Sequence, residues 1–205
     1  MGQKISLPDL HGSYQVVMVG LDRAGKSTLL YRLKTDQYIS TSPTVGFNCE
    51  KIKVSDGRAK DATFVFWDIG GEEKLRSLWR SYIRHTDALI FVVDSSDPER
   101  LEEAKLELSN LLRTPDLSTT VPLVVLANKQ DLPSALAPTT IESELCSLPG
   151  DSSSRPKASF GTCAVTGEIS NSGDDIRSLL DILYDLIHEC RKLQKAKKKS
   201  SQLFR

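Results

Sequence analysis

The sequence predicts one α/β domain whose mostly parallel, six-stranded sheet carries helices on both faces. Three observations lead to this prediction. Strand-like and helix-like segments alternate along the 205 residues, apolar runs at 88–94 and 121–127 have the character of buried parallel strands, and the stretches between strands repeat apolar residues at helical spacing. With 39% hydrophobic and 26% charged residues, the chain has the composition of a globular domain with one core.

The elements follow one another in a regular order. Strands are expected at 14–19, 48–54, 61–67, 88–94, 121–127 and 159–164, and helices at 26–34, 72–84, 98–112, 138–147 and 174–195. Asp97 and Pro98 suit the N-cap and first position of the third helix. Asp56-Gly57 predicts a hairpin turn between the second and third strands. We divide the chain into an N-terminal segment at 1–12, a folded domain at 13–190 and a basic tail at 191–205.

A glycine-rich segment links the first strand to the first helix. It fits the pattern G-x-x-x-x-G-K-[ST] and consists of Gly20, Leu21, Asp22, Arg23, Ala24, Gly25, Lys26 and Ser27, with Thr28 next. In this setting, backbone N–H groups form a concave cradle for phosphate oxygens, and the helix N-terminus adds positive potential. Lys26 is expected to reach the β- and γ-phosphates, and the Ser27 hydroxyl to bind Mg²⁺. An ordinary strand-to-helix turn is the alternative, and the flanking segments argue against it.

A second motif selects the base. Asn128, Lys129, Gln130 and Asp131 follow the apolar run at 121–127. The Asp131 carboxylate can accept two N–H groups side by side, from N1 and N2 of guanine, and adenine lacks this pair. Asn128 can donate to guanine N7, and the Lys129 stem can lie along the purine. The later segment Thr162-Cys163-Ala164 offers the backbone N–H of Ala164 to guanine O6.

Residues for the metal and for the γ-phosphate lie elsewhere in the chain. Asp68 follows a strand-like run and is expected to hold a Mg²⁺-bound water, while Thr44 is placed to add a second hydroxyl to the metal. Taken alone, Thr44 would be an ordinary loop hydroxyl. Asp68 is followed by Ile69, Gly70, Gly71 and Glu72, and the Gly71 N–H is free to approach a γ-phosphate. Loss of that phosphate would release both segments, as in an order–disorder switch.

Together these motifs resemble those of the small GTPases of the ADP-ribosylation-factor (Arf) and Arf-like family, over roughly residues 12–190. The matching text is Gly-Leu-Asp-x-Ala-Gly-Lys at 20–26, Pro-Thr-Val-Gly-Phe-Asn at 43–48, Trp-Asp-Ile-Gly-Gly at 67–71, Leu-Trp-Arg-Ser-Tyr at 78–82, Asn-Lys-Gln-Asp at 128–131 and Thr-Cys-Ala at 162–164. The long segment between the switches and the lysine-rich tail look most like the Arf-like type-four branch.

The resemblance implies a P-loop NTPase fold of the Ras-like small-GTPase type and a switch between GTP and GDP that uses Mg²⁺. It also implies an exchange factor, a GTPase-activating protein and effectors as partners, in membrane trafficking or in cytoskeletal and signalling regulation. Phe47, Trp67 and Tyr82 match the aromatic trio that the family offers to effectors, with core packing as the alternative. We expect a monomer.

One residue departs from the family pattern where hydrolysis takes place. Family members usually carry a glutamine after the second glycine of the 67–71 motif, and this chain carries Glu72. An ionised carboxylate donates no hydrogen bond and adds negative charge beside a γ-phosphate whose charge must be neutralised. The sequence therefore predicts GTP hydrolysis slower than about 10⁻⁴ per second, with Lys26 and Gly71 as the other catalytic groups. Protonation of Glu72, or an arginine from an activating partner, would counter this effect.

Two further questions stay open at this stage. Arg23 stands at a loop position where relatives carry a small residue, and it either offsets Glu72 or points to solvent. The chain is a switch or, in a second function class, a GTP-loaded binding scaffold with negligible turnover. A P-loop kinase is disfavoured because nothing resembles an arginine-rich lid and the motif at 128–131 would have no role.

The two ends of the chain point to a membrane. Met1-Gly2-Gln3-Lys4-Ile5-Ser6 fits the myristoylation pattern, with Gly2 as the acceptor. The tail at 191–205 holds seven basic residues and no acids, which leaves 20 basic and 27 acidic residues elsewhere, a net charge of −7. A myristoyl chain alone binds bilayers weakly, with K about 10⁴ M⁻¹, and each basic residue adds about 1 kcal/mol at an anionic leaflet.

Lipid and tail together predict attachment to an anionic membrane surface, at the cytoplasmic face of the plasma membrane, with part of the protein in the cytoplasm. The alternatives are a solvated tail without a partner, or an importin and entry into the nucleus through Lys197-Lys198-Lys199. A nucleic acid is not the expected partner. Cys49, Cys146, Cys163 and Cys190 form no C-x-x-C pair, which fits a reducing compartment, and no apolar run approaches the length that crosses a bilayer.

Overall fold

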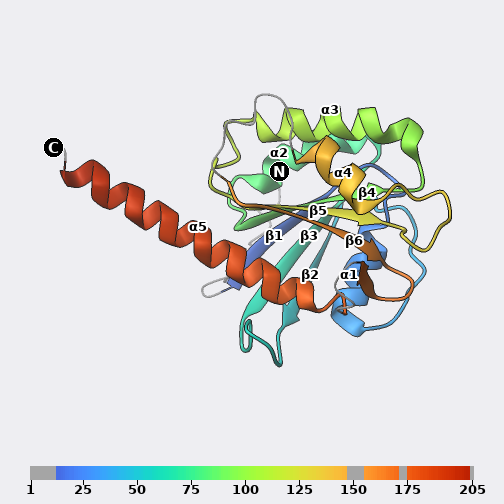
Figure 1. Ribbon diagram of the computed structural model, residues 1–205, viewed down its shortest axis with the longest axis horizontal. Coiled ribbons are helices and arrows are strands. Elements are labelled where there is room, and N and C mark those ends of the chain that lie inside the picture. Colours follow the sequence, from blue (N-terminus) through green and yellow to red (C-terminus); the bar gives the residue numbers. More distant parts are fainter. Residues whose placement is uncertain (1–12, 147–154, 171–174, 204–205) are drawn as a thin grey trace, which may run out of the picture.

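Seven strands form one sheet in the part of the chain that the structure describes. The computed structural model describes residues 13–146, 155–170 and 175–203. The strands are β1 (Ser13–Val19), β2 (Phe47–Lys53), β3 (Thr63–Ile69), β4 (Ala88–Asp94), β5 (Leu123–Asn128), β6 (Lys157–Cys163) and β7 (Glu168–Ser170). Their order across the sheet is β2-β3-β1-β4-β5-β6-β7, and Figure 1 shows the sheet between helices on its two faces.

The centre of the sheet is parallel and both edges are antiparallel. β1 pairs in parallel with β3 and β4, and β5 in parallel with β4 and β6. β2 pairs antiparallel with β3, which confirms the predicted hairpin, and Gly57 in its turn has φ +73°. The predicted number of six strands is wrong, because β7 adds an antiparallel edge beside β6. At three residues, β7 is too short to leave a readable alternation in the sequence.

The helices fall into two layers. They are α1 (Lys26–Thr35), α2 (Trp79–Ile83), α3 (Leu101–Leu112), α4 (Pro138–Leu145) and α5 (Ser178–Leu203), with 3₁₀ turns η1 (Glu73–Leu78) and η2 (Pro98–Arg100). One core cluster joins α1 and α5 to alternate residues of the central strands, such as Val16 and Met18 of β1. A second cluster joins α2, α3 and α4 to the residues between them, such as Val17 and Val19. Successive side chains of a strand point to opposite faces, so β4 and β5 are apolar on both faces up to their last residues, Asp94 and Asn128.

Three expected helices differ from the prediction. The segment at 98–112 begins with η2, so α3 starts only at Leu101, and the Asp97 side chain makes no capping hydrogen bond. The segment at 72–84 is not one helix but η1 followed by the short α2. No residue of η1 is fully buried, and its last residue, Leu78, packs only partly buried against the second core cluster, whereas the buried Trp79 and Ile83 anchor α2. The last helix begins at Ser178 rather than 174, and it continues to Leu203 instead of ending at 195. Lysine, glutamine and alanine favour helix even without an apolar stripe, and Figure 1 shows α5 running well beyond the body.

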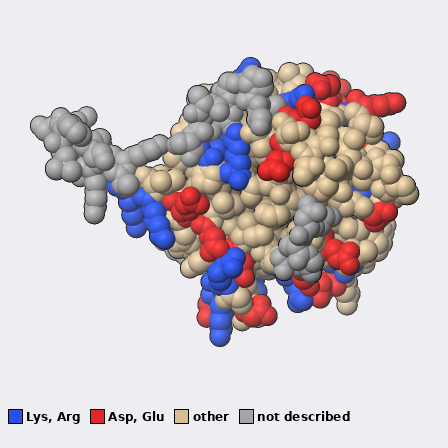
Figure 2. Space-filling model, viewed as in Figure 1, with Lys and Arg blue, Asp and Glu red and all other residues tan. Residues whose placement is uncertain are grey.

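No helix in the described ranges is both long and apolar enough to cross a bilayer. Figure 2 shows acidic and basic side chains interspersed over one face of the body. Basic side chains stand on α5 where it leaves the body, and Arg191, Lys192 and Lys195 are exposed there.

Candidate functional site

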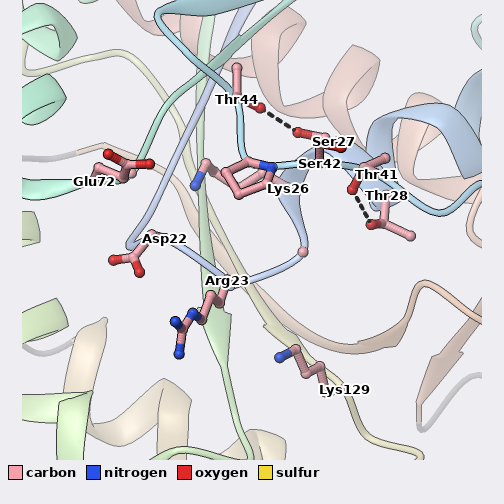
Figure 3. A pocket seen from close by; sticks show the side chains of 13 residues that line it. Asp22, Arg23, Lys26, Ser27, Thr28, Thr41, Ser42, Thr44, Glu72 and Lys129 are labelled. Atoms are coloured by element: carbon pink, nitrogen blue, oxygen red, sulfur yellow. Dashed lines mark hydrogen bonds between the residues drawn. The ribbon is translucent and has the colours of Figure 1, made fainter.

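A cavity of about 510 Å³ opens at the carboxyl edge of the central strands, where open α/β sheets bind ligands. Of the predicted site residues, the cavity is lined by Asp22, Arg23, Gly25, Lys26, Ser27, Thr28, Thr44, Gly71, Glu72 and Lys129. Thr41, Ser42 and Pro43 complete the lining, and the Thr41 and Thr28 hydroxyls are 3.0 Å apart. Figure 3 shows Glu72 on one side of the cavity and this threonine pair on the other.

The ammonium group of Lys26 lies on the floor of the cavity. Lys26 is the first residue of α1, and its side chain turns back so that Nζ donates to the Gly20 and Leu21 carbonyls, each at 2.9 Å. Burial lowers the pKa of Lys26 to about 8. A buried cation whose hydrogen bonds go to main-chain oxygens would gain from a polyphosphate, so the loop fits the phosphate-binding role predicted for it.

The glycine before α1 is required by its surroundings. Gly25 has φ +89°, and a Cβ atom there would lie 2.4 Å from Nδ2 of Asn128. No other residue fits this conformation and this space together. The phosphate loop therefore lies directly against Asn128, in the motif that the sequence predicts to select the base.

Three oxygen-bearing side chains meet beside Lys26. The Ser27 hydroxyl is 2.8 Å from the Thr44 hydroxyl, and it donates to Oδ2 of Asp68 at 2.5 Å. Asp68 is fully buried at the end of β3, and its Oδ1 atom has no hydrogen-bond partner among the described residues. Burial raises the pKa of Asp68. Hydroxyls and one carboxylate with an unused oxygen are the donors that Mg²⁺ prefers, so the residues fit the metal.

The loop that carries Thr44 and the segment after β3 close over the phosphate loop together. The Gly70 N–H donates to the Gly46 carbonyl at 2.9 Å, which joins the two segments. A Cβ atom on Gly71 would lie 2.4 Å from both Asp22 N and Gly20 O. Gly71 thus lies directly on the phosphate loop, and its approach to a γ-phosphate stays a prediction.

Glu72 and Arg23 both lie at the rim of the cavity. The Glu72 carboxylate forms an ion pair with Lys74 at 2.8 Å, and 36% of its side chain is exposed. Arg23 has φ +64° and is exposed, and Figure 3 shows its side chain extending away from Ser27 and Thr44. The sequence left two roles open for Arg23. This geometry favours a side chain in solvent over one that offsets the negative charge of Glu72.

Sequence reasoning missed an arginine beneath this segment. Arg76 of η1 has a side chain only 8% exposed, and it pairs with Glu103 at 2.7 Å and Glu107 at 2.9 Å, both on α3. Arg100 forms a further pair with Asp22 of the phosphate loop at 2.8 Å. Burial opposes the ionisation of Asp22, but the hydrogen bond from Arg100 holds its pKa below the usual value. The acidic residues near Arg76 in the sequence are Glu72 and Glu73, but its ion-pair partners lie on α3. No local sequence pattern therefore indicated these pairs.

The base-selecting motif lies at the end of β5. Asn128 is buried; its amide Nδ2 donates to the Ala24 carbonyl at 2.8 Å, and its Oδ1 accepts from the Ala164 N–H at 3.3 Å. Asn128 therefore links the phosphate loop to the loop after β6. The two contacts predicted for guanine, from Asn128 to N7 and from the Ala164 N–H to O6, involve groups that here bind protein atoms.

The remaining base-selecting residues surround Asn128. Asp131 is exposed, and it accepts from the Cys163 thiol at 3.2 Å. Lys129 adopts φ +67° and pairs with Asp94 at 2.5 Å, while the Gln130 N–H donates to the Thr162 carbonyl at 3.1 Å. Asp131, Cys163 and Ala164 lie outside the lining of the phosphate cavity, as a separate base subsite would.

The three aromatic residues form one cluster at the sheet edge. The ring centroids are 5.7 Å apart for Phe47 and Trp67, 5.2 Å for Phe47 and Tyr82, and 5.5 Å for Trp67 and Tyr82. Phe47 is 40% exposed, and the other two are half-buried. The Trp67 indole donates to Gln15 at 2.9 Å. Gly2 lies outside the described residues, as do the side chains of the tail after Lys195.

Comparison with known proteins identifies the family. A model described as "ADP-ribosylation factor family" matches residues 4–180. This chain belongs to the ADP-ribosylation factor family. Mouse ADP-ribosylation factor-like protein 4A is 47% identical over 194 residues, covering 95% of this chain and 92% of that protein. Human ADP-ribosylation factor-like protein 4C is 48% identical over 190 residues, covering 91% and 93%. The resemblance to the type-four branch is thereby confirmed.

Solved structures agree with the fold of an Arf-like small GTPase. The Arl6 BBS3 small GTPase of Trypanosoma brucei with the bound nucleotide analogue GppNp superimposes with a TM-score of 0.67. It shares 32% identity and covers 89% of this chain and 99% of its own. The mammalian SRP receptor structure has a TM-score of 0.70 at 22% identity and shares the fold. Membership of this family implies binding of guanine nucleotide and Mg²⁺, and work with exchange factors, GTPase-activating proteins and effectors.

Proposed function

We propose that this Arf-like chain is a membrane-attached switch that recruits effectors while GTP is bound and that hydrolyses GTP very slowly. The observation that carries the proposal is the convergence of Ser27, Thr44 and Asp68 beside the Lys26 ammonium. These groups come from α1, the following loop and β3, so a ligand held by all of them fixes three segments at once.

The phosphate end of the cavity would be used as follows. Ser27, Thr44 and, through water, Asp68 would hold Mg²⁺, which would supply positive charge to neutralise the phosphates. Lys26 supplies a second positive charge from the floor of the loop. Gly71 offers its N–H from the opposite side, where a side chain would collide with the loop. Without a γ-phosphate, the Thr44 loop and Gly71 lose a shared partner, and the surface that they form loosens.

The base end would select guanine. Asp131 is exposed beside Cys163 and is free to accept the paired N–H groups of guanine. Asn128 bonds to both the phosphate loop and the loop after β6, and so holds the two loops in fixed positions relative to each other. A base that lacks the two adjacent donors would leave the Asp131 carboxylate unpaired, which costs binding free energy.

Glu72 is the reason for slow turnover. Its carboxylate lines the cavity near Gly71, where a donor and positive charge would help the reaction. The ion pair with exposed Lys74 offsets only part of the negative charge. The same observation favours a second candidate, a scaffold that stays loaded with GTP. Nucleotide extracted from the purified protein separates the two: mostly GTP supports the scaffold, and mostly GDP supports the switch.

Effectors would bind at the aromatic cluster of Phe47, Trp67 and Tyr82. Phe47 begins β2 directly after the Thr44 loop, so its position depends on that loop. Aromatic rings that touch one another and are partly exposed offer an apolar contact at low entropy cost. Phe47→Ala is expected to abolish effector capture by the GTP-analogue form while leaving nucleotide affinity unchanged.

Attachment to a membrane would use a myristoyl group on Gly2 together with the basic tail. Sedimentation with vesicles tests both signals. The myristoylated chain should bind vesicles that contain anionic lipid at least tenfold more tightly than Gly2→Ala, and neutral vesicles only weakly. Equal binding of the two proteins would contradict the lipid anchor.

Calorimetry on the nucleotide-free chain with Mg²⁺ tests the central proposal. GTP and GDP should bind, and ATP should bind at least a thousandfold more weakly. Asp131→Asn is the matched variant: it should lose GTP affinity and gain affinity for xanthosine triphosphate, whose C2 carbonyl accepts from the new amide. Equal heats from ATP and GTP would overturn the proposal.

A further inference from the structure

One arginine joins the helix after the phosphate loop to the loop that follows β6. Arg32 of α1 donates from Nε to the Ala164 carbonyl at 3.2 Å and from Nη2 to the Val165 carbonyl, across 132 and 133 residues of sequence. Its Nη1 atom donates to the Asp36 carbonyl at 2.9 Å. Among the described residues, all three hydrogen bonds of this guanidinium therefore go to main-chain oxygens, and two of them hold the same loop.

The loop is shaped to receive this side chain. It turns tightly between β6 and β7, where the Gly167 N–H donates to the Cys163 carbonyl at 2.9 Å. Gly167 has φ +83°, and a Cβ atom there would lie 3.2 Å from Arg32 Cδ. The glycine thus leaves room for the Arg32 stem to cross the turn, and the guanidinium reaches Ala164 and Val165 from the outside.

Ala164 is held from two sides. Asn128 Oδ1 accepts from its N–H, and Arg32 donates to its carbonyl, while Ala164 itself is buried. The N–H of Ala164 is the group proposed to meet guanine O6. The N–H and the carbonyl of Ala164 belong to neighbouring peptide planes that meet at its Cα atom, so hydrogen bonds on both planes together restrict the backbone of this residue and the direction of its N–H.

We propose that Arg32 is a positioning residue for guanine recognition, which sets the spacing between the base subsite and the phosphate subsite. The inference rests on the proposed nucleotide binding at this site. α1 carries Lys26 and Ser27 at its start and Arg32 six residues after Lys26. One short rigid helix therefore holds the phosphate ligands at one end and the base loop at the other. When bound phosphates fix the start of α1, the hydrogen bonds of Arg32 also fix the position of the loop after β6 relative to that helix.

A neighbouring residue provides a matched control. Lys34 lies in the same last turn of α1 and also places positive charge near the carboxyl end of the helix. Its ammonium pairs with Glu50 of β2 rather than with the base loop. A role limited to the charge at the helix end would be shared by both residues, whereas a role in positioning Ala164 belongs to Arg32.

The test compares nucleotide release from the full-length native chain, Arg32→Ala, Arg32→Lys and Lys34→Ala in the presence of Mg²⁺. Three ligands are used: GDP, inosine diphosphate, and 6-thioguanosine diphosphate. Inosine keeps O6 but lacks the N2 amino group, and 6-thioguanine replaces O6 with sulfur, which is a weaker acceptor. Arg32→Ala should release GDP and inosine diphosphate about tenfold faster, since one well-aimed hydrogen bond is worth about a factor of ten.

The 6-thioguanine analogue tests whether Arg32 acts through the contact between the Ala164 N–H and O6 of the base. Its release should change by less than about threefold in Arg32→Ala, because it depends little on the O6 contact from the outset. Arg32→Lys should restore part of the loss, and Lys34→Ala should stay within about twofold of the native chain for every ligand. If Arg32→Ala does not fold, Arg32→Lys carries the same comparison with a smaller effect.

Two results would overturn the inference. One is an equal acceleration for all three ligands, which would mark a general structural role, and the other is no acceleration at all. If the native chain binds none of the guanine nucleotides, the proposed function itself is wrong. This outcome is seen with the native chain alone, before any variant is measured.

Discussion

Arg76 donates from Nε to the Gly71 carbonyl at 2.9 Å, so a side chain of η1 holds the residue that lies on the phosphate loop. The same guanidinium is tied to Glu103 and Glu107 of α3. The segment that closes the cavity is therefore anchored to a helix on the second core cluster, and not only to a bound ligand. Because no residue of η1 is fully buried, this anchor adds to the contact of Leu78 with the second core cluster in holding the turn to the body.

Removal of this anchor should affect the GTP form more than the GDP form. Arg76→Ala is expected to weaken binding of a non-hydrolysable GTP analogue about tenfold and to leave GDP affinity within about twofold. It should also lower the free energy of unfolding by about 2 kcal/mol, since Glu107 loses its ion pair and Glu103 keeps only the pair with Arg100. Fluorescent-nucleotide titration and urea denaturation measure the two effects. Arg80→Ala, at an exposed position of α2, is the control, and an equal loss of both nucleotides would refute the coupling.

Glu72 should limit hydrolysis. In single-turnover assays, Glu72→Gln is expected to hydrolyse GTP at least tenfold faster than the native chain, because glutamine removes the negative charge and can orient water. Glu73→Gln removes one acidic charge from the neighbouring exposed residue and should change the rate by less than about twofold. A native chain that turns over GTP as fast as Glu72→Gln would show that Glu72 does not hinder the reaction.

Nucleotide binding should take up a proton above pH 8. Burial lowers the pKa of Lys26 from 10.5 to about 8, although Asp68 and Asp22 oppose the shift. Between these values the unfolded chain holds a proton that the folded, ligand-free chain lacks, so the contribution of Lys26 to stability rises with pH across that range. A bound polyphosphate favours the ammonium form, so GDP affinity should fall as pH rises through 8.

Calorimetry in two buffers of different ionisation enthalpy measures this proton. At pH 8.5, GDP binding should take up about 0.7 proton, against about 0.1 at pH 7. Equal uptake at the two pH values would show that Lys26 is fully charged in the free chain.

The β2–β3 hairpin should depend on one carboxylate of α5. Asp181 Oδ1 accepts from the Ala59 N–H at 2.7 Å, and Gly57 packs against the same group. Asp181→Ala should lower the free energy of unfolding by about 1–2 kcal/mol, because the hairpin loses an acceptor for a main-chain donor. Asp185→Ala breaks only an exposed pair with Arg58 and should cost less than about 0.5 kcal/mol. Equal losses in denaturation experiments would contradict this ranking.

The sequence predicted the phosphate loop and the central strands well because both have local signatures. Glycines and Lys26 occur at fixed spacing, and β4 and β5 are unbroken apolar runs. Ser27, Thr44 and Asp68 could be assigned from the motifs around them, and the structure brings their oxygens together.

What the sequence did not reveal depends on contacts between distant residues. Arg32 and Arg76 have partners on other elements, so neither has a recognisable spacing. The break between η1 and α2 follows from packing, because only the second half of that segment meets the core. The end of α5 was placed too early because the prediction followed the apolar stripe, and a helix can continue on backbone propensity alone.

The length of α5 has a geometric consequence. Its 26 residues make a rod of about 39 Å that leaves the body as a continuation of a packed helix. Unlike a flexible tether, a continuous helix fixes the orientation of the body as well as its distance from the far end of the helix. If its far end rests on a lipid surface, the tilt of the sheet is restricted, and the cluster around Phe47 meets its partners from a limited range of angles. The protein would then search for its partners in the plane of the lipid surface, and its body would present only a few orientations to them.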